Sequence, residues 1–498
     1  MYRRTQFHSS VAPASGGAGA GCVVREHFNR EASTTELWIK ALIAALFLPE
    51  GLSFFIGDFR LSLARVLIII LTGTAIVRFL QSTNRSVTVP SDVFAIMTGL
   101  WMIIAPSITD GGDGLKGGGM LALEFSGAYL IFRNLLSARD SAVRVVFFLC
   151  TMIVVIVPLA VLDPLSDRLV VYETVRGLTG YSKGAFDWAK QVHSETMYRH
   201  GLVRAMGPLE HSILFGAACA WLGTIAACTF SPKPFGILIA VVACVGIAAS
   251  QAQGPLVAYA LSLSLMFYYF ITKRMVTRWK IIGIIFCACL GFIFLFSANP
   301  VATLLGLGGV NPETGWYRQA IWQAVTPFVM EKPIFGMGLS EEWDWQSSGA
   351  LVGASVDAMW LRLAMMLGIP GTLLVFLTMT GSYLLGSIDR SSFLSHAERR
   401  LSVGLGLATV AAIFLGFTVH IWGTCWVLLG AFAGMRGGLA AAHKLRGKAF
   451  APLNSGMTHG AAASLKLPQD ISIVSGFRHW RRGDPTGRTS SVARSIRA

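Results

Sequence analysis

Long apolar runs separated by short polar connections occupy the chain from residue 37 to residue 438. Each run holds roughly 16–22 residues, and a helix of about 20 residues crosses the hydrocarbon core of a bilayer, which is about 30 Å thick. Transmembrane strands would instead show alternating apolar and polar positions over segments of about ten residues, and this chain lacks that pattern. The pattern therefore predicts an all-α integral membrane protein.

The apolar runs predict about 12 transmembrane helices, most of them joined by short loops. The predicted spans are residues 37–56, 61–80, 90–108, 118–136, 142–162, 208–230, 234–250, 255–272, 281–298, 356–386, 403–419 and 422–438. Two connections are long, at about 163–207 and about 299–355. The predicted membrane domain, residues 37–438, is flanked by a polar segment at residues 1–36 and a basic, Gly- and Ser-rich segment at residues 439–498. Both flanking compositions predict disordered tails.

The composition is that of a chain lying mostly in lipid. Hydrophobic residues make up 54% and charged residues 13%, against about 25% charged in soluble domains. The net charge of +15 lies mainly in short connections and the C-terminal tail, as the positive-inside rule produces, so we expect no nucleic-acid partner. Of the eight cysteines only Cys22 lies outside a predicted span. Their spacing does not suit a metal or redox motif, and we expect no metal or other cofactor.

The distribution of Lys and Arg predicts the orientation of the chain. With both termini in the cytoplasm, the cytoplasmic segments hold 28 Lys and Arg residues and the outer segments hold 10, eight of them in the two long loops. The positive-inside rule has least force in long loops. We therefore expect both termini to be cytoplasmic and both long loops to face outward.

Charged residues inside the predicted spans gather near one end. Glu50, Arg65, Glu124 and Arg362 each lie within roughly 10 Å of the outer end of a span, at 1.5 Å of rise per residue. A charge in a span is costly and often functional. Few polar groups occur at the midplane, where a proton relay would need them. Two readings stay open: the side chains pair or snorkel to fix helix packing, or they line a polar cavity open to the outer face.

The first long loop ends in a segment that contains several charged and titratable residues. Its residues Arg204-Ala-Met-Gly-Pro-Leu-Glu210-His211 lead directly into the next span. Arg204 and His211 are seven residues apart, which is two helical turns. An arginine at an interface is also a common membrane anchor, and a histidine at a helix start is a common cap.

The second long loop contains a predicted interfacial helix. Aromatic and apolar residues recur every three to five positions from Trp316 to Phe328, as in helices that lie in the membrane surface. Arg318 and Trp322 share one face of this helix. Asp357 then opens the next span.

Together these motifs resemble the O-antigen ligase and Wzy-type polysaccharide polymerase family, in particular its exopolysaccharide polymerase branch. The resemblance covers roughly residues 37–438. It rests on Pro49-Glu-Gly-Leu-Ser53, Arg204-x-x-Gly-Pro-x-x-His211, Trp316-Tyr-Arg318-x-x-x-Trp322, Pro333-x-x-Gly336-x-Gly338, Val356-Asp357-x-x-Trp360-Leu361 and Gly368-Ile-Pro-Gly371. It implies a metal-independent glycosyltransferase of the bacterial inner membrane. Such an enzyme transfers a glycan from a polyprenyl-pyrophosphate-linked oligosaccharide to an acceptor glycan at the outer leaflet.

The resemblance also implies roles for four residues. Departure of pyrophosphate from the anomeric carbon develops negative charge, which the planar fork of an arginine can bind, and Arg204 and Arg318 are the candidates. The acceptor hydroxyl needs a base. Ligases of the family carry a histidine where this chain has Asp357, which disfavours a ligase, and Asp357 and His211 both remain candidate bases.

Other residues and partners follow from the same resemblance. Seven further residues could line the site: Glu50, Arg65, Glu124, Glu210, Trp322, Trp360 and Arg362. A chain-length regulator or an export protein could be a further partner. The alternatives are a ligase that attaches glycan to a lipid or protein acceptor, and a flippase or other transporter. A transporter more often shows internal repeats and polar groups at the midplane, and the sequence shows no convincing repeat.

The orientation can be tested by labelling in intact cells. Cysteines introduced near Lys183 and near Ser347 should react with a membrane-impermeant thiol reagent, because both long loops are expected outside. A cysteine introduced near Ser395 should react only after permeabilisation. The parent chain, with its eight cysteines, gives the background. Labelling at Ser395 alone would overturn the predicted orientation.

Overall fold

The protein is described from a computed structural model. The structure describes residues 34–56, 59–81, 87–136, 140–180, 197–297, 303, 312–339, 356–385 and 388–450. Most of the two predicted tails and much of both long loops lie outside the described residues. The chain divides into a unit of residues 1–447 and a unit of residues 448–498, and the helical bundle described here belongs to the first.

Helices make up nearly all of the described chain. Residues 34–46 are helical. The remaining helices are α2 (Leu63–Gln81), α3 (Pro90–Ala122), η1 (Leu123–Gly127), α4 (Ala128–Asn134), α5 (Ser141–Ser166), α6 (Val170–Thr179), α8 (Ser212–Phe230), α9 (Pro234–Ser250), α10 (Gln253–Ile271), α11 (Arg278–Phe296), α13 (Pro312–Glu331), α14 (Met359–Thr380), η3 (Gly381–Leu385), η4 (Ile388–Arg390), α15 (His396–Gly416) and α16 (Gly423–Phe450). Two short antiparallel hairpins complete it: β1 (Ser53–Ile56) with β2 (Phe59–Ser62), and β3 (Tyr198–Arg199) with β4 (Leu202–Val203).

Nine helical stretches of the described residues are long and apolar enough to cross a membrane, and α9 is a shorter apolar helix. The predicted all-α membrane protein is therefore confirmed. The helix predicted within the second long loop is also present as α13, and its residues Ile321, Val325 and Val329 pack against α14.

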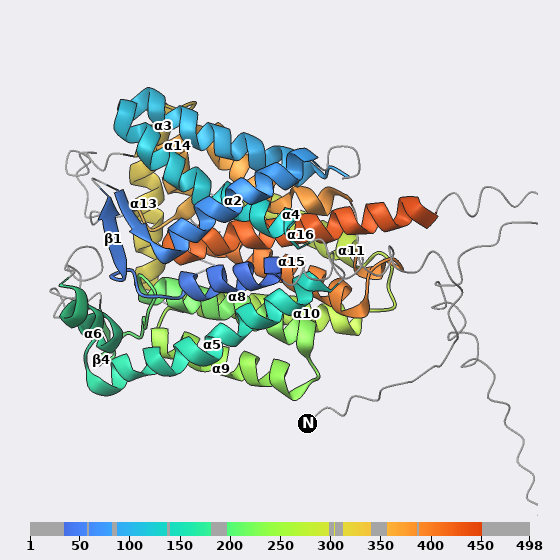
Figure 1. Ribbon diagram of the computed structural model, residues 1–498, viewed down its shortest axis with the longest axis horizontal. Helices are drawn as coiled ribbons and strands as arrows, with labels where there is room; N and C mark the ends of the chain where they lie inside the picture. Colours follow the sequence, from blue (N-terminus) through green and yellow to red (C-terminus); the bar gives the residue numbers. More distant parts are fainter. Residues whose placement is uncertain are drawn as a thin grey trace, which may run out of the picture. The chain divides into compact units, whose positions relative to one another are not determined.

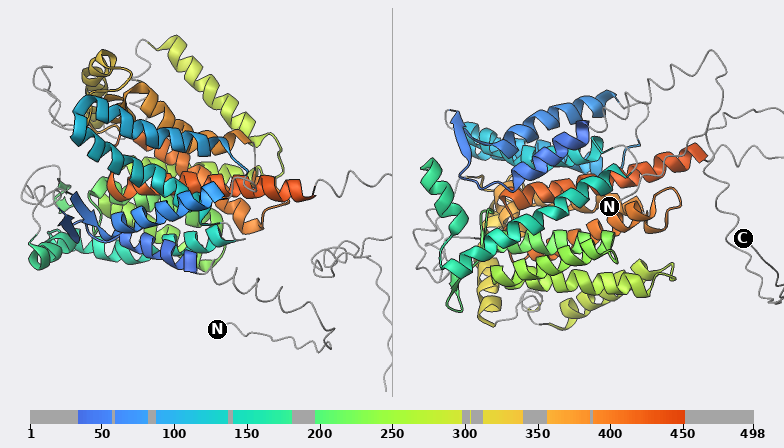
Figure 2. Two further views of the ribbon diagram at one scale, coloured as in Figure 1. Left: turned by 45° about the horizontal axis from the view of Figure 1, so that its top comes forward. Right: turned by 60° about the horizontal axis from the view of Figure 1, so that its bottom comes forward.

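The strands β1 and β4 and the helices α6 and α13 gather at one end of the bundle. This end is on the left of Figure 1, and α16 extends away from it. We call this the loop end. Successive helices alternate in direction, so that α5 and α9 finish at the loop end while α8 and α16 begin there. Two further views show the same alternation (Figure 2).

α3 contains a tight reversal. Gly111 has φ +62°, outside the helical region, and separates two helical segments. A Cβ atom at Gly114 would overlap the carbonyl oxygen of Pro106, and one at Gly118 would overlap that of Met102. Residues 102 and 118 would lie about 24 Å apart in a straight helix, so the chain folds back on itself. The reversal accounts for two of the predicted spans, 90–108 and 118–136.

The predicted span 356–386 is not one straight helix. α14 is broken at Gly368, which has φ +73°, and the rings of Trp360 and Phe376 lie 5.9 Å apart although they are sixteen residues apart in sequence. The segment around Gly336 fills the bend: Ile369 N donates to Pro333 O (2.8 Å) and Met337 N donates to Met365 O (2.6 Å). A side chain at Gly368 would overlap the backbone of Ile334, so this close approach requires glycine.

The predicted span 37–56 is also wrong over its second half. The helix ends at residue 46, and residues 53–56 form strand β1 instead. Pro49 and Gly51 explain the break, because proline and glycine both oppose a helix interior. The Phe-Phe-Ile run that follows has high strand propensity. Glu50 therefore lies in a turn, where it forms an ion pair with Arg60 of β2.

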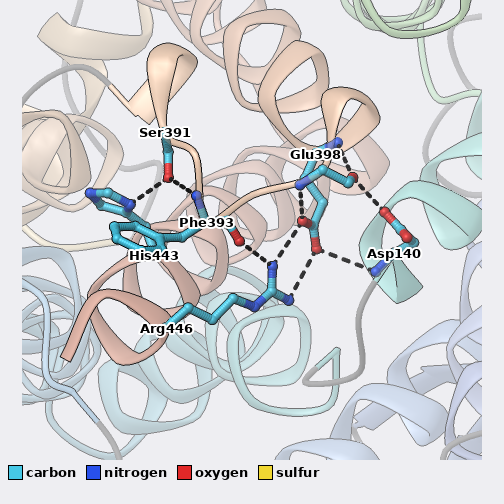
Figure 3. Close-up of polar contacts among 7 residues, drawn as sticks. Asp140, Ser391, Phe393, Glu398, His443 and Arg446 are labelled. Carbon is cyan, nitrogen blue, oxygen red and sulfur yellow. Dashed lines mark hydrogen bonds and ion pairs between the residues drawn. The ribbon is translucent and has the colours of Figure 1, made fainter. Parts of the chain in front are cut away.

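The opposite end of the bundle is held by a polar network (Figure 3). Glu398 and Ser395 form a capping box at the start of α15, and Ser395 Oγ donates to Asp140 Oδ1 (2.6 Å) ahead of α5. Arg446 of α16 pairs with Glu398 (3.0 Å). Ser391 Oγ and His443 Nδ1 lie 2.7 Å apart. α16 thus continues to Phe450, beyond the predicted span end at residue 438, and Arg446 of this extension binds Glu398 of α15.

Two adjacent glycines give a matched test of the α3 reversal. Gly118→Ala should lower the free energy of unfolding by about 1–3 kcal/mol, because the new methyl group overlaps the backbone of Met102. Gly119→Ala meets no atom within 4 Å and should be neutral or stabilising by up to about 1 kcal/mol. Thermal melting of the detergent-solubilised protein measures both. Equal melting temperatures for the two variants would contradict the close packing described.

Candidate functional site

A buried carboxylate fixes the first segment of the site, residues 204–211. Asp163, near the end of α5, is 1% exposed. Its Oδ2 accepts from the backbone N–H groups of Met206 and Gly207, both at 3.0 Å, and its Oδ1 accepts from Val170 N at 3.0 Å. Buried N–H groups must find acceptors, so this carboxylate holds Met206 and Gly207, ahead of α8, against the end of α5 and the start of α6.

The C-terminal carbonyl groups of α9 hold Arg204 of this segment and Arg199 of the hairpin that precedes it. Arg204 Nε donates to Ser250 O (3.2 Å), and Arg199 Nη1 donates to Gln251 O (2.7 Å). Ala205 N also donates to Ala249 O (3.0 Å). The last carbonyls of a helix have no partner within the helix and carry partial negative charge, which suits guanidinium groups. Arg204 is only 5% exposed.

The second segment of the site consists of α13 and the start of α14, which pack against each other. Ile321 and Val325 of α13 form a buried cluster with Val356 and Ala358, the two neighbours of Asp357. Arg318 lies one turn before Ile321 and is 8% exposed. The contact therefore sets Arg318 beside Asp357.

Arg204, Arg318 and Asp357 form one electrostatic cluster, joined by Arg199. Burial lowers the pKa of Arg204 to about 10; Arg199 adds to the shift and Asp357 opposes it. Burial also lowers the pKa of Arg318, with Asp357 again opposing and Arg199 adding. Both arginines stay charged at neutral pH. The structure thus brings together both arginines and one of the two bases that the sequence suggested.

His211, the other candidate base, lies next to this cluster. It is the N-cap of α8, and its Nδ1 accepts from Ile213 N (3.1 Å). Its ring lies 5.8 Å from that of Trp422. Burial, followed by the charge of Arg204, lowers the pKa of His211 to about 4, so the ring is neutral at pH 7. Since Nδ1 accepts a hydrogen bond, Nε2 carries the proton of the neutral ring.

Glu210 has a structural partner of its own. Its Oε1 accepts from Thr424 N (2.9 Å) and Thr424 Oγ1 (3.1 Å) at the start of α16. Burial raises the pKa of Glu210 above its usual value. This carboxylate joins the starts of α8 and α16 at the loop end.

Three of the four charged residues predicted near the outer ends of spans, Glu50, Arg65 and Glu124, form ion pairs. Glu50 pairs with Arg60, and Arg65 Nε binds Glu124 Oε1 at 2.9 Å. Arg65 Nη1 also donates to Arg60 O (3.0 Å), so the β1–β2 hairpin and α2 are tied together. These contacts agree with a packing role for Glu50, Arg65 and Glu124.

Trp322 of α13 and Trp360 of α14, both predicted to line the site, bind the C-terminal end of α15. Trp322 Nε1 donates to Phe417 O (3.2 Å) and Trp360 Nε1 donates to Ile413 O (2.9 Å), and the Trp322 ring stacks on that of Phe417. Near them, burial and the charge of Arg362 hold the pKa of His420 well below its usual value.

The sequence did not point to Arg199, Asp163 or His420. Only Arg199 carried a signal, since Tyr198-Arg-His-Gly-Leu-Val203 can form a short hairpin around Gly201. Within the described ranges, no group of three or more His, Cys, Asp or Glu residues could hold a metal ion.

Comparison with known families gives one match. Residues 238–376 match the family described as O-antigen ligase, a range that includes Arg318 and Asp357. The resemblance to the O-antigen ligase and Wzy-type family is thereby confirmed. A comparison with curated proteins gives no match.

The role of Asp163 can be tested by removing one of its two acceptor oxygens. In Asp163→Asn, an NH₂ group replaces one oxygen and faces the backbone N–H groups of either Met206 and Gly207 or Val170. We expect the free energy of unfolding to fall by about 1.5–3 kcal/mol. Hydrogen exchange should quicken in peptides that contain Met206 and Gly207. Asp167→Asn, at the exposed residue that ends α5, is the control. If hydrogen exchange in these peptides were unchanged in Asp163→Asn, Asp163 would not be what orders Met206 and Gly207.

Proposed function

We propose that the protein polymerises lipid-pyrophosphate-linked oligosaccharide repeat units in exopolysaccharide biosynthesis. The main support for this function is the cluster of Arg204, Arg318 and Asp357, which lies beside His211 at the loop end. The match of residues 238–376 to the O-antigen ligase family supports a lipid-linked glycan as the donor. In the proposed orientation the loop end faces outward and both termini are cytoplasmic, which puts the site at the outer leaflet of the inner membrane.

The proposed reaction is a displacement at the anomeric carbon of the donor. An acceptor sugar hydroxyl attacks this carbon, and the bond from the carbon to the pyrophosphate oxygen breaks. The polyprenyl pyrophosphate leaves with the bonding electron pair, and the hydroxyl proton passes to a base. Arg204 and Arg318 would stabilise the charge on the departing oxygens, because guanidinium groups already held in place need little reorganisation. The proposal assigns this work to arginines without a metal ion.

We assign the base to Asp357 rather than His211. The Nδ1 lone pair of His211 is used by Ile213 N–H, and its other nitrogen carries a proton, so the ring is a donor toward a substrate. A carboxylate has lone pairs to spare even when an arginine binds it. A bound pyrophosphate also competes for Arg204 and Arg318, which leaves Asp357 a better proton acceptor. His211 Nε2–H is then suited to bind a sugar hydroxyl.

A ligase of the same family is the second candidate, and the description of the matched family supports it. Both enzymes would use the same donor and differ in the acceptor. Asp357 at the position where ligases of the family carry histidine favours the polymerase. A chain-length regulator or export protein would be a partner of a polymerase.

The function can be tested with purified full-length protein and a lipid-pyrophosphate-linked repeat unit, by sizing the products. A ladder of repeat multiples with release of polyprenyl pyrophosphate supports a polymerase. A single transfer to an added lipid or protein acceptor supports a ligase. Arg204→Ala and Arg318→Ala should each slow transfer about 100–1000-fold, with normal membrane insertion. If folded, membrane-inserted protein released no polyprenyl pyrophosphate, both functions would be refuted, and a flippase assay would follow.

The base assignment predicts a ranking of two conservative variants. Asp357→Asn should abolish transfer, since the amide keeps the shape but cannot take the proton. His211→Gln should retain part of the activity and should leave the pH profile between 5 and 8 unchanged. If His211 were the base, its variant would be the inactive one. Parent activity would then fall only as the pH drops through about 4, where the buried ring gains its proton.

A further inference from the structure

Arg199 and Arg204 lie on the same face of the β3–β4 hairpin. Tyr198 pairs with Val203 and Arg199 pairs with Leu202, and the bond from Arg204 N to Met197 O (3.0 Å) extends the ladder by one pair. Cross-strand partners share a face, and residues two apart share a face. The opposite face carries Tyr198 and Val203, which pack into a separate apolar cluster.

The ends of both side chains are also held side by side. The two guanidinium groups donate to the carbonyl oxygens of consecutive residues, Ser250 and Gln251. Arg199 is half-buried whereas Arg204 is 5% exposed, so Arg199 extends the site toward solvent. Like charges held this close repel each other, which favours the binding of an anion between them.

We propose that Arg199 is a third cationic residue of the pyrophosphate site, and that the site is built for two linked phosphates rather than one. Arg199, Arg204 and Arg318 with Asp357 carry two positive charges in excess. A lipid–pyrophosphate–sugar diester carries two negative charges, one on each phosphate. Arg204 and Arg318, which flank Asp357, bind the phosphate next to the sugar, and Arg199 binds the phosphate next to the lipid. This inference rests on the proposed function and adds to it a third cationic residue and an assignment of each phosphate to its arginines.

The competing role for Arg199 is structural, as a cation that caps the C-terminus of α9. The two roles differ in what lysine can replace. A lysine still places a positive charge near the helix end, but it cannot form the two parallel hydrogen bonds with which arginine binds a phosphate. A purely structural role would also affect all anions alike.

The test uses inorganic pyrophosphate and inorganic phosphate as probes, with the full-length protein in detergent and affinities from titration calorimetry. The parent should prefer pyrophosphate. Arg199→Ala should weaken pyrophosphate binding roughly 10–100-fold and phosphate binding less, so that the preference falls. Arg199→Lys should recover only part of the loss. Arg176→Ala, at an exposed arginine of α6 at the same end, should behave as the parent.

Two results would overturn the inference. One is unchanged pyrophosphate affinity in Arg199→Ala while Arg204→Ala loses it; the other is an equal loss for both probes, which marks a structural role. Both leave the proposed function standing, because that depends on transfer from the lipid-linked repeat unit. Conversely, a parent protein that binds pyrophosphate through Arg199 but transfers no glycan would refute the function and keep the site.

Discussion

The end of α9 is the point on which the candidate site depends. Its last carbonyl groups accept hydrogen bonds from Arg199, Arg204 and the backbone of Ala205. Burying a guanidinium group is costly unless its N–H groups are bound, and the unpaired carbonyls of a helix end supply neutral acceptors with partial negative charge. These carbonyl oxygens bind the guanidinium groups of Arg199 and Arg204 without adding a full negative charge. A site held in this way keeps an excess of positive charge, which an anionic lipid pyrophosphate can use.

Close backbone contacts bring the remaining parts to the same place. The glycine-lined reversal in α3, the bend of α14 at Gly368 and the carboxylate of Asp163 each fix a connection at the loop end. The opposite end is held separately by Glu398, Arg446 and Asp140 (Figure 3). Rigid attachment at both ends suits a reaction whose charge stabilisation requires donors already in position.

The sequence predicted the features that depend on span-length hydrophobicity and on short local motifs. Apolar runs of span length identified most helices, and the motifs identified Arg204, Arg318 and Asp357, which the fold brings together. The misses have physical causes that a local pattern does not contain. The bend at Gly368 exists because Pro333 and Ile334 approach its backbone, and Asp163 matters because Met206 and Gly207 lie against it. The tautomer of His211 follows from a cap that only the observed start of α8 defines.

The central claim is that the cationic cluster at the loop end binds the pyrophosphate of a lipid-linked glycan with the reacting carbon facing Asp357. The most direct test is an experimental structure of the full-length protein with a non-hydrolysable lipid-pyrophosphate-linked sugar. We expect phosphate oxygens within hydrogen-bond reach of Arg204 and Arg318, and the sugar on the side of Asp357. A pyrophosphate bound at the opposite end of the bundle, or a sugar directed away from Asp357, would contradict it.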